Sequence, residues 1–400
     1  MALNRPPGFP PAHLRTVARL AEPLRAPVLD RYPTAESLTG RVVGRTGLDD
    51  FGPGLVVEPL QQLLDTVMAD PTFSTVGLRA WPTMLSRLLA SRLRVVDHVR
   101  RHPELTELEV TRPIIITGMP RTGTTLLYNL MATMPGARPL LGWESLSPLP
   151  GPVRRRRAAY AAWVRFVDLN VPELKAIHAL NPSGPDEGLE LMDRTLYSFN
   201  FMLYTFPYAE WLVDRPPAEV TEAWRLWRWQ LQMLQAQGPS GYWVLKAPTF
   251  MGSFPTVDAL IPNARYVMTH RDLSSALPSA VSLLTVVGAA MRRPGAQVDL
   301  PRFIDQMVAI ANRTRKQLED RPNVQVLYPD LMADPAGTVR SILEEFGEPV
   351  PDDLDDRVAA HLAAHPQHKH GRHDYRLERF GLVPDDLEPY VSDYARDLGL

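Results

Sequence analysis

The sequence has 400 residues, of which 45% are hydrophobic and 22% charged, so it can fold into one large globular domain or two. Its formal net charge of −2 gives no overall positive field, which argues against nucleic acid as a partner. The absence of cysteine excludes disulfides and thiolate chemistry.

The N-terminal part, residues 1–110, is predicted to be a mostly helical extension. Apolar residues recur there at three- and four-residue spacing over 60–68 and 81–101. The first 20 residues contain no apolar run typical of a signal peptide, and we therefore expect a cytoplasmic protein. We find no candidate chemistry in this part of the chain.

Residues 111–350 alternate short β-rich runs with helical patterns, which predicts an α/β core with a parallel sheet. The expected strands are 114–117, 242–245, 265–269 and 324–328. A long helical segment, 151–235, separates the first strand from the second. The uncharged run 273–291 is interrupted by Pro278, so we expect a buried helix there and not a membrane span. Residues 351–400 are expected to form a charged C-terminal tail.

The first expected strand leads into a glycine-bracketed loop, Gly118-Met-Pro-Arg-Thr-Gly123, followed by Thr124, Thr125 and an apolar-periodic stretch. In a strand, loop and helix of this kind, backbone N–H groups converge on a bound anion, so we predict a phosphate cradle. The loop is similar to a Walker A motif, but Thr124 replaces its lysine and the cation, Arg121, lies inside the loop. The loss of that lysine argues against ATP hydrolysis.

Two later strand ends carry further polar groups. Lys246 ends the second expected strand and can supply an ammonium group for an anionic leaving group. Arg271 follows the third strand, and Ser279 lies eight residues later in a helix that Ser274 or Ser275 can N-cap. A guanidinium group with a hydroxyl at a helix N-terminus is a good receptor for a terminal phosphate.

These motifs occur in the same order as in bacterial sulfotransferases that use 3′-phosphoadenosine-5′-phosphosulfate (PAPS), and the sequence resembles that family over about residues 45–385. The resemblance implies a P-loop-like three-layer α/β sandwich with a central parallel sheet, and PAPS as co-substrate without a metal. It also implies transfer to a hydroxyl of a small apolar or aromatic acceptor, with Arg121 and Lys246 as catalytic residues and a tail that closes over the nucleotide. The residues implied in PAPS binding are Pro120, Arg121, Thr122, Gly123, Thr124, Thr125, Arg271, Ser279, Gly371 and Arg372.

The predicted general base is Glu144, which follows Arg121 by 23 residues, because that connection should return it to the carboxyl end of the sheet. Glycan-modifying sulfotransferases use a glutamate at a comparable distance, and Glu187 and His178 are the alternatives. Many members of the family carry a histidine where Thr249 stands, which puts a base at that position in doubt. Aromatic residues expected to line the acceptor pocket, or to form part of the core, are Trp163, Phe166, Tyr197, Phe199, Phe201 and Tyr204.

The sequence leaves several alternatives open. A P-loop kinase or NTPase is disfavoured by the missing lysine, and a nucleotide-binding relative without catalysis is kept open by Thr249. A metal site lacks the glutamate of H-E-x-x-H; its candidate ligands are His361, His365, His368, His370 and His373. The run Arg154–Arg157 points all round a helix, so we expect a solvated face and not an acceptor or membrane site. Neither the acceptor nor the oligomeric state follows from the sequence.

Overall fold

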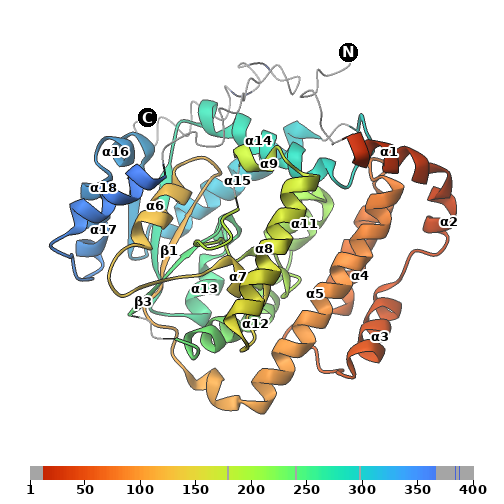
Figure 1. Cartoon of the computed structure of the whole chain (residues 1–400), viewed down its shortest axis with the longest axis horizontal. Helices are drawn as coiled ribbons and strands as arrows, with labels where there is room; N and C mark the ends of the chain where they lie inside the picture. Colours follow the sequence, from red (N-terminus) through yellow and green to blue (C-terminus); the bar gives the residue numbers. More distant parts are fainter. Residues whose placement is uncertain are drawn as a thin grey trace.

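The computed structural model describes residues 12–177, 180–238, 241–296 and 299–365, together with Val383 and Leu387. At its centre is a five-stranded parallel sheet in the order β2-β3-β1-β4-β5. Two of these strands, β1 and β3, are labelled in Figure 1. The strands are β1 (Ile114–Gly118), β2 (Ala137–Pro139), β3 (Tyr242–Lys246), β4 (Arg265–His270) and β5 (Asn323–Leu327). Helices flank the sheet, which confirms the predicted α/β fold.

The central strands form because their apolar residues can be buried on both sides. β1 and β3 are completely buried and β4 nearly so, which is typical of a parallel sheet covered on both faces. All four predicted strands are confirmed to within one residue at each end, although Tyr328 begins helix α16 (Tyr328–Ala333) instead of ending β5. β2 was not predicted, because three residues that include Arg138 and Pro139 show no strand pattern. It lies at the edge of the sheet, where proline is tolerated.

Alternate side chains of the strands enter two different cores. Ile114 and Ile116 pack into a core with α6, α16, α17 and α18, whereas Ile115 and Tyr266 pack into one with α12, α13 and the N-terminal helices. These two cores make the fold three-layered. The bounds are α6 (Thr124–Met131), α17 (Pro335–Glu345) and α18 (Leu354–Ala364) for the first face, and α12 (Pro217–Gln235) and α13 (Phe254–Leu260) for the second.

The N-terminal extension is helical and shares the core of the sheet. It contains α1 (Ala12–Ala21), a 3-10 turn (Glu22–Leu24), α2 (Arg25–Leu29), α3 (Ala35–Thr46), α4 (Val57–Ala69), α5 (Thr75–Arg101) and a second 3-10 turn (Pro103–Glu107). Leu78 of α5 belongs to the same hydrophobic core as Ile115 of β1. The buried side chain of Arg92 donates hydrogen bonds to the main-chain oxygen of Phe51 at 2.7 Å and to that of Arg194 at 3.1 Å. This arginine ties the extension to a segment about 100 residues further along the chain.

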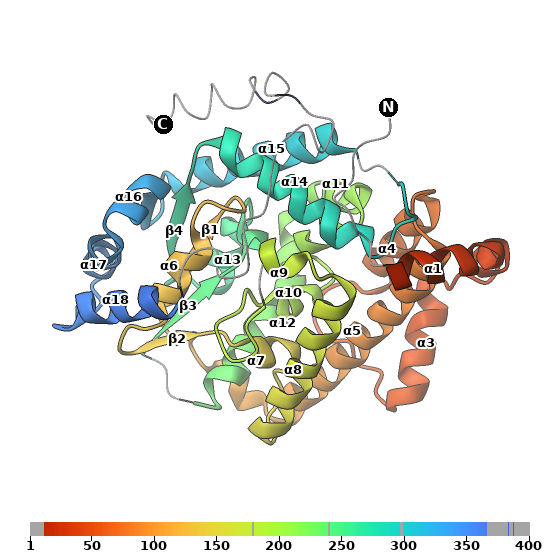
Figure 2. The same ribbon diagram turned by 45° about the horizontal axis from the view of Figure 1, so that its top comes forward.

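A helical insert lies between β2 and β3. It contains α7 (Gly142–Leu146), α8 (Val153–Asn170), α9 (Leu174–Ile177), α10 (Leu189–Asp193), η3 (Phe199–Leu203) and α11 (Phe206–Val213), ahead of α12. The helices α14 (Leu273–Ala289) and α15 (Leu300–Leu318) follow β4, and α14 packs beside α9 (Figure 2). α14 is the buried helix expected for the uncharged run, with Pro278 inside it. None of the helices in the described ranges has the length and apolar character that a membrane crossing requires.

Candidate active site

The three predicted motifs meet at the carboxyl end of β1. β2 and β3 lie on one side of β1, and β4 and β5 on the other, so the strand order switches at β1. In open parallel sheets, ligands bind in the crevice outside the carboxyl ends of the strands at such a switch point. The register places Lys246 of β3 beside Ile116, and Thr269 of β4 beside Gly118. Both flanking strand ends therefore reach the loop that follows β1.

Hydroxyl groups fix this loop to the neighbouring strands. Thr117 Oγ1 donates to the main chain just after β3 at 3.1 Å. Thr122 Oγ1 donates to the main-chain oxygen of Met119 at 2.8 Å and lies 2.5 Å from Thr269 Oγ1. Gly118 leaves no room for a side chain, because a Cβ atom there would lie 2.5 Å from the same Thr269 oxygen. The loop is therefore held in one shape by its own contacts.

Two residues of the loop have a left-handed backbone conformation. The φ angle is 73° at Arg121 and 96° at Gly123, which is the N-cap of α6. A turn of this kind directs successive N–H groups to one side and forms an anion-binding concavity at the start of the helix. At a residue other than glycine this conformation costs on the order of 1–3 kcal/mol, and such strain concentrates at functional sites. The backbone of the predicted cradle therefore suits a phosphate group.

Three cationic side chains surround the loop and line one cavity. Arg121 is exposed and donates from Nη1 to the last carbonyl of α9 at 3.3 Å. Lys246 is only 3% exposed and forms an ion pair with Glu187. Arg271 donates to the main-chain oxygen of Arg121 at 3.2 Å, and its guanidinium carbon lies 4.3 Å from the ring centre of Tyr328. The structure thus brings together cations from three separate sequence motifs.

Two buried hydroxyl groups near these cations have no hydrogen-bond partner among the described residues. They belong to Thr249, just after β3, and to Ser279 of α14, which are 3% and 1% exposed. A buried polar group left unpaired costs about 1–3 kcal/mol, so such groups are normally paired with water or a ligand. Both residues line the same cavity as Lys246, which marks them as candidate ligand contacts.

The helix that carries Ser279 begins differently from the prediction. Its N-cap is Asp272, and neither Ser274 nor Ser275, because Asp272 Oδ1 accepts a hydrogen bond from the N–H of Ser274 at 3.0 Å. Aspartate is as good a cap as serine, and its negative charge also suits the positive end of the helix. Arg271 therefore lies just before the helix, with Ser279 about two turns inside it.

A cavity of about 2370 Å³ opens from the loop. Five of the six residues predicted to bind the nucleotide from the loop and the helix start line it: Pro120, Arg121, Gly123, Thr124 and Thr125. Thr122, which was predicted to bind the nucleotide, is absent from the lining because its side chain is buried against Thr269. The remaining walls come mainly from α5, α8, η3, α14 and α15 and include Met84, Leu88, Val164, Leu283 and Met307.

Five of the six predicted aromatic residues line this cavity: Trp163, Phe166, Phe199, Phe201 and Tyr204. The sixth, Tyr197, does not line it. The Tyr197 ring belongs to the main hydrophobic core, and its hydroxyl donates to Glu219 of α12 at 2.5 Å. An alternation of inward and outward aromatic residues in an irregular segment cannot be recognised from spacing alone.

Glu144, the predicted general base, does not line the cavity. It is 5% exposed, and Arg138 binds both of its carboxylate oxygens, at 2.8 and 3.0 Å. The N–H of Leu141 also donates to this carboxylate, at 3.0 Å, so that it caps α7. The chain does not return to the loop here, because β2 lies at the edge of the sheet beyond β3. The expectation that Glu144 faces the acceptor is therefore wrong.

A row of three acidic residues, of which only Glu187 is predicted from the sequence, lines the cavity instead. Glu187, Glu190 and Asp193 follow one another at three-residue spacing, so they lie on one face of α10 and its entry turn. Burial, reinforced by the charge of Asp186, raises the pKa of Glu190 to about 7, and Ser145 Oγ donates to its carboxylate at 2.7 Å. Burial raises the pKa of Asp193 to about 6. The three-residue spacing of these acidic residues is the feature of the sequence that could have revealed the row.

Several predicted residues lie outside the described part of the chain: His178, His368, His370, Gly371, Arg372 and His373. His361 and His365 are described; their rings stack with centres 4.4 Å apart, and burial lowers the pKa of His361. Within the described ranges, no three His, Cys, Asp or Glu side chains are grouped so that they could hold a metal ion.

Comparison with known proteins gives one consistent result. A family model described as "Sulfotransferase family" matches residues 113–352. The omega-hydroxy-beta-dihydromenaquinone-9 sulfotransferases Stf3 of Mycobacterium bovis and of Mycobacterium tuberculosis are each 23% identical over 308 residues, which cover 71% of this chain and 75% of those proteins.

Two solved structures are similar over almost the whole chain. The sulfotransferase STF9 from Mycobacterium avium has a TM-score of 0.80 at 27% identity and covers 92% of this chain and 97% of its own. The sulfotransferase STF1 from Mycobacterium tuberculosis H37Rv has a TM-score of 0.74 at 24% identity, with 90% and 99% coverage, and this second likeness is one of fold.

Proposed function

This chain belongs to the sulfotransferase family, and we propose that it transfers the sulfuryl group of PAPS to a hydroxyl group of an apolar acceptor. The observation that carries the proposal is the loop after β1, whose left-handed residues and surrounding cations open into one large, mainly apolar cavity. In-line displacement needs the attacking hydroxyl, the sulfur and the leaving oxygen in a row. Space for an acceptor directly beside an anion cradle supports that arrangement.

Donor binding falls to the loop and to the end of β4. The loop amides and Arg121 would hold the 5′-phosphosulfate, and Arg271 and Ser279 the 3′-phosphate. The Ser279 hydroxyl supports this role, because it is buried without a partner among the described residues and a phosphate oxygen would satisfy it. The Tyr328 ring and a loop carbonyl already orient the Arg271 guanidinium group, so little ordering remains when a phosphate binds. The predicted contributions of Gly371 and Arg372 from the tail remain part of this proposal.

In this proposal Lys246 stabilises the charge of the leaving group, and Glu187 accepts the proton of the acceptor. Their ion pair is accessible to the cavity, so a leaving phosphate competes with Glu187 for the ammonium group and releases the carboxylate toward the acceptor. As the acceptor oxygen bonds to sulfur and the bond from sulfur to the phosphate oxygen breaks, Glu187 takes the acceptor proton. The negative charge passes to the leaving phosphate, where Lys246 and Arg121 stabilise it. Arg121 stays protonated, so its role is electrostatic.

The cavity walls support an apolar acceptor. Ligand pockets recognise such molecules with apolar walls and a few fixed polar groups, and η3 and α14 supply walls of that kind next to the cradle. The relative Stf3 is named as a sulfotransferase of omega-hydroxy-beta-dihydromenaquinone-9, and we propose a hydroxylated, largely apolar acceptor for this chain as well. A screen that finds turnover of sugars but of no apolar alcohol or phenol would contradict this part of the proposal.

Nucleotide choice tests the proposal against a P-loop kinase or a nucleotide-binding relative without catalysis. Adenosine 3′,5′-bisphosphate at 100 times its Kd should stabilise the protein by about 2.7 kcal/mol in thermal unfolding, and 5′-AMP or ATP with magnesium at the same concentration should stabilise it much less. Equal stabilisation by 5′-AMP and the bisphosphate would exclude a 3′-phosphate site. Bisphosphate binding without any transfer from PAPS to the screened acceptors would indicate a non-catalytic relative.

We also propose that transfer needs no metal ion, because Arg121, Lys246 and Arg271 already supply positive charge around the cradle. Turnover should be the same in EDTA and in zinc or magnesium. Loss in EDTA with recovery in zinc would assign the site to the histidine-rich tail. The cytoplasmic location expected from the sequence likewise remains a prediction.

A further inference from the structure

The outer face of α8 carries a dense positive charge that the proposed reaction does not use. The helix contains five arginines and one acidic residue, Asp168, in a chain of net charge −2. Arg156 is turned inward and donates to the main-chain oxygen of Ser147 at 2.6 Å, whereas the other four arginines are exposed: Arg154, Arg155, Arg157 and Arg165. We call these four the basic face. From the sequence we expect only a solvated surface for the run Arg154–Arg157; the structure adds that Arg156 is buried and that Arg165 is exposed on the same helix. Across the described part of the chain, none of them forms an ion pair with a carboxylate.

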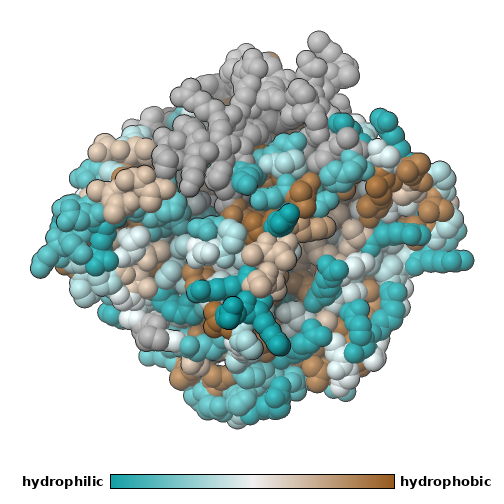
Figure 3. All heavy atoms as spheres, viewed as in Figure 1, coloured by the Kyte–Doolittle hydropathy of each residue, from teal (hydrophilic) through white to brown (hydrophobic). Residues whose placement is uncertain are grey.

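Large apolar side chains adjoin the basic face at its C-terminal end. Phe166 and Leu169 of α8 are 64% and 63% exposed. α1 begins beside this end of α8, since His13 Nε2 lies 3.3 Å from Asn170 Oδ1. In Figure 3, strongly hydrophilic side chains gather over the lower part of α8, and hydrophobic ones lie over its upper end and over α1. Single exposed apolar residues are common, but here they border one charged helix face.

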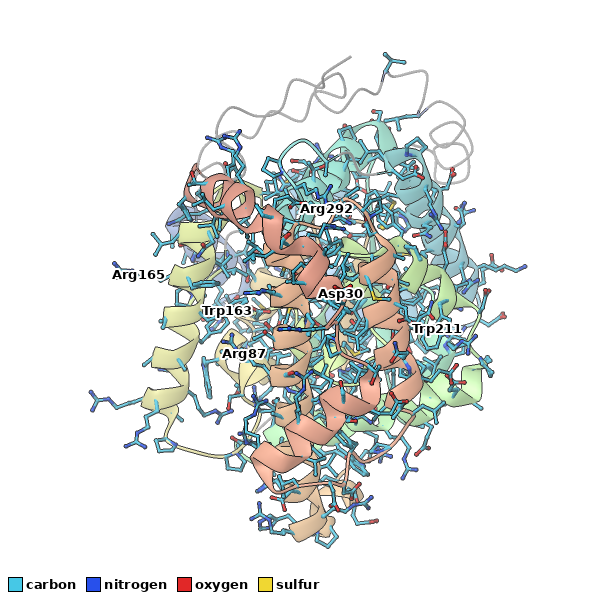
Figure 4. The ribbon with its side chains drawn as sticks, turned by 90° about the vertical axis from the view of Figure 1, so that its right-hand side faces the viewer. Asp30, Arg87, Trp163, Arg165, Trp211 and Arg292 are labelled. Carbon is cyan, nitrogen blue, oxygen red and sulfur yellow. The ribbon has the colours of Figure 1, made fainter. Side chains whose placement is uncertain are left out.

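The same helix forms a wall of the cavity. Trp163 and Val164 line the cavity from the inner side of α8, and Phe166 both lines it and is largely exposed. Figure 4 shows Trp163 on the side of α8 that faces Arg87 of α5, whereas Arg165 points outward. The mouth of the cavity therefore lies at the edge of the exposed face of α8.

We propose that this face docks on a membrane surface with anionic headgroups, so that the cavity mouth opens at the bilayer and an apolar acceptor enters from it. Arginines combined with exposed Phe and Leu side chains are the pattern of helices that lie in the membrane interface. Anionic headgroups match an unpaired basic face in charge, and the apolar side chains bordering it can enter the acyl boundary. The docking stands on the surface alone, and only the entry route rests on the proposed function.

Co-sedimentation of the full chain with lipid vesicles tests the docking. The chain should bind vesicles of phosphatidylcholine with about 30% phosphatidylglycerol, bind pure phosphatidylcholine far more weakly, and lose most binding when salt is raised from about 0.1 to 0.5 M. The triple variant Arg154→Ala/Arg155→Ala/Arg165→Ala should bind about 100-fold more weakly, at about five-fold per arginine. Leu169→Ser should weaken binding by about ten-fold, because Leu169 lies on the apolar border and does not line the cavity.

A matched control separates position from net charge. Arg41→Ala/Arg45→Ala/Arg313→Ala removes three exposed arginines from α3 and α15 and gives the same net charge as the triple variant in α8. It should bind anionic vesicles nearly as well as the wild type. Equal losses in the two triple variants, or equal binding to neutral and anionic vesicles, would overturn the docking. Binding to soluble poly-glutamate but not to vesicles would overturn it too, and would assign the face to an acidic protein.

The docking and the proposed function fail independently. With an acceptor dissolved in detergent, the α8 triple variant should keep wild-type turnover and bisphosphate stabilisation, because none of its three residues lines the cavity. Vesicle binding without transfer would leave the docking standing and remove the reaction. Transfer without vesicle binding would support the reaction and contradict the docking.

Discussion

The cavity has one wall made of strand ends and another made of helices, and polar groups are held differently in the two. Behind the strand-end wall, Thr117 and Thr122 hold the loop through bonds to main-chain oxygens, and Arg271, which lines the cavity, is fixed by a carbonyl and a ring. In the helix wall, side chains such as Leu283 and Met307 offer shape and apolar contact only. Under the proposed function, the fixed polar wall would receive the donor and the apolar wall the acceptor. Substitutions in the first should therefore change chemistry, and those in the second substrate choice.

The largest effect is expected at Glu187, where the two walls meet. Glu187→Gln removes the proposed proton acceptor but keeps the shape of the side chain, so kcat should fall by about 10²–10⁴. Bisphosphate affinity should stay close to that of the wild type, because Lys246 remains available to the phosphate. Steady-state kinetics and calorimetric titration measure the two quantities. Near-normal kcat would remove Glu187 from the proton transfer, and Glu190→Gln is the next variant to examine.

Glu144 should act on stability and not on chemistry. Glu144→Ala leaves Arg138, which is 12% exposed, without its carboxylate, and breaking a buried ion pair costs about 3–5 kcal/mol. Urea denaturation should show this loss, while the kcat of the folded variant should change little. Glu144→Gln retains an oxygen that can accept from the N–H of Leu141, so its loss should be smaller. A folded Glu144→Ala protein with kcat reduced a hundred-fold would restore Glu144 to the mechanism.

Arg271 tests whether the strand-end wall binds the 3′-phosphate of the donor. Arg271→Ala should weaken binding of adenosine 3′,5′-bisphosphate by about 1.5–3 kcal/mol, the usual contribution of a charge-assisted hydrogen bond. Binding of 5′-AMP should not change, since it has no 3′-phosphate. Ser279→Ala should show the same selectivity with a smaller loss. Equal losses for both nucleotides would mean that Arg271 supports the loop through its bond to Arg121 instead of binding phosphate.

The smallest effect is a pH dependence of stability from the helix wall. The pKa of Glu190 is about 7 in the folded chain against 4.5 ordinarily, so between these values the folded state binds more protons than the unfolded state. The free energy of unfolding should therefore fall as pH rises through this range, by on the order of 1–3 kcal/mol, and level off above about pH 7. Glu190→Gln should flatten this slope in urea denaturation between about pH 5 and 8, whereas Glu36→Gln on the exposed side of α3 should not. A slope unchanged by Glu190→Gln would assign it to other groups.

The strand-end wall could be predicted because each part of it is local in the sequence. Gly118, Gly123 and the threonines after them reveal the cradle, and Lys246 and Arg271 each follow a recognisable buried strand. The N-cap of α14 was misassigned because Asp272 and the serines after it are equally good caps, and spacing does not choose between them.

The helix wall could not be predicted to the same extent, because the residues that contact one another there lie far apart in the sequence. Lys246 and Glu187 are 59 residues apart, and no local pattern marks Glu187 as the partner. The position of Glu144 is predicted wrongly because β2 has almost no strand pattern. The sequence therefore does not show that β2, and Glu144 after it, lie at the edge of the sheet. Tyr197 and Tyr204 belong to one irregular segment, and only packing decides that the first enters the core and the second the cavity.

The hydrogen bond between the Thr122 and Thr269 hydroxyl groups has a consequence for the synthesis of the protein on the ribosome. These residues are 147 positions apart, so at about 5–20 residues per second the second is made on the order of ten seconds after the first. During that interval the nascent chain carries the loop of β1 without the strand that fixes it. The loop can take its final shape only after β4 has emerged and docked beside β1. The proposed donor site therefore cannot form until about two-thirds of the chain has been made, and a ribosome stalled before β4 displays the loop without the strand that fixes it.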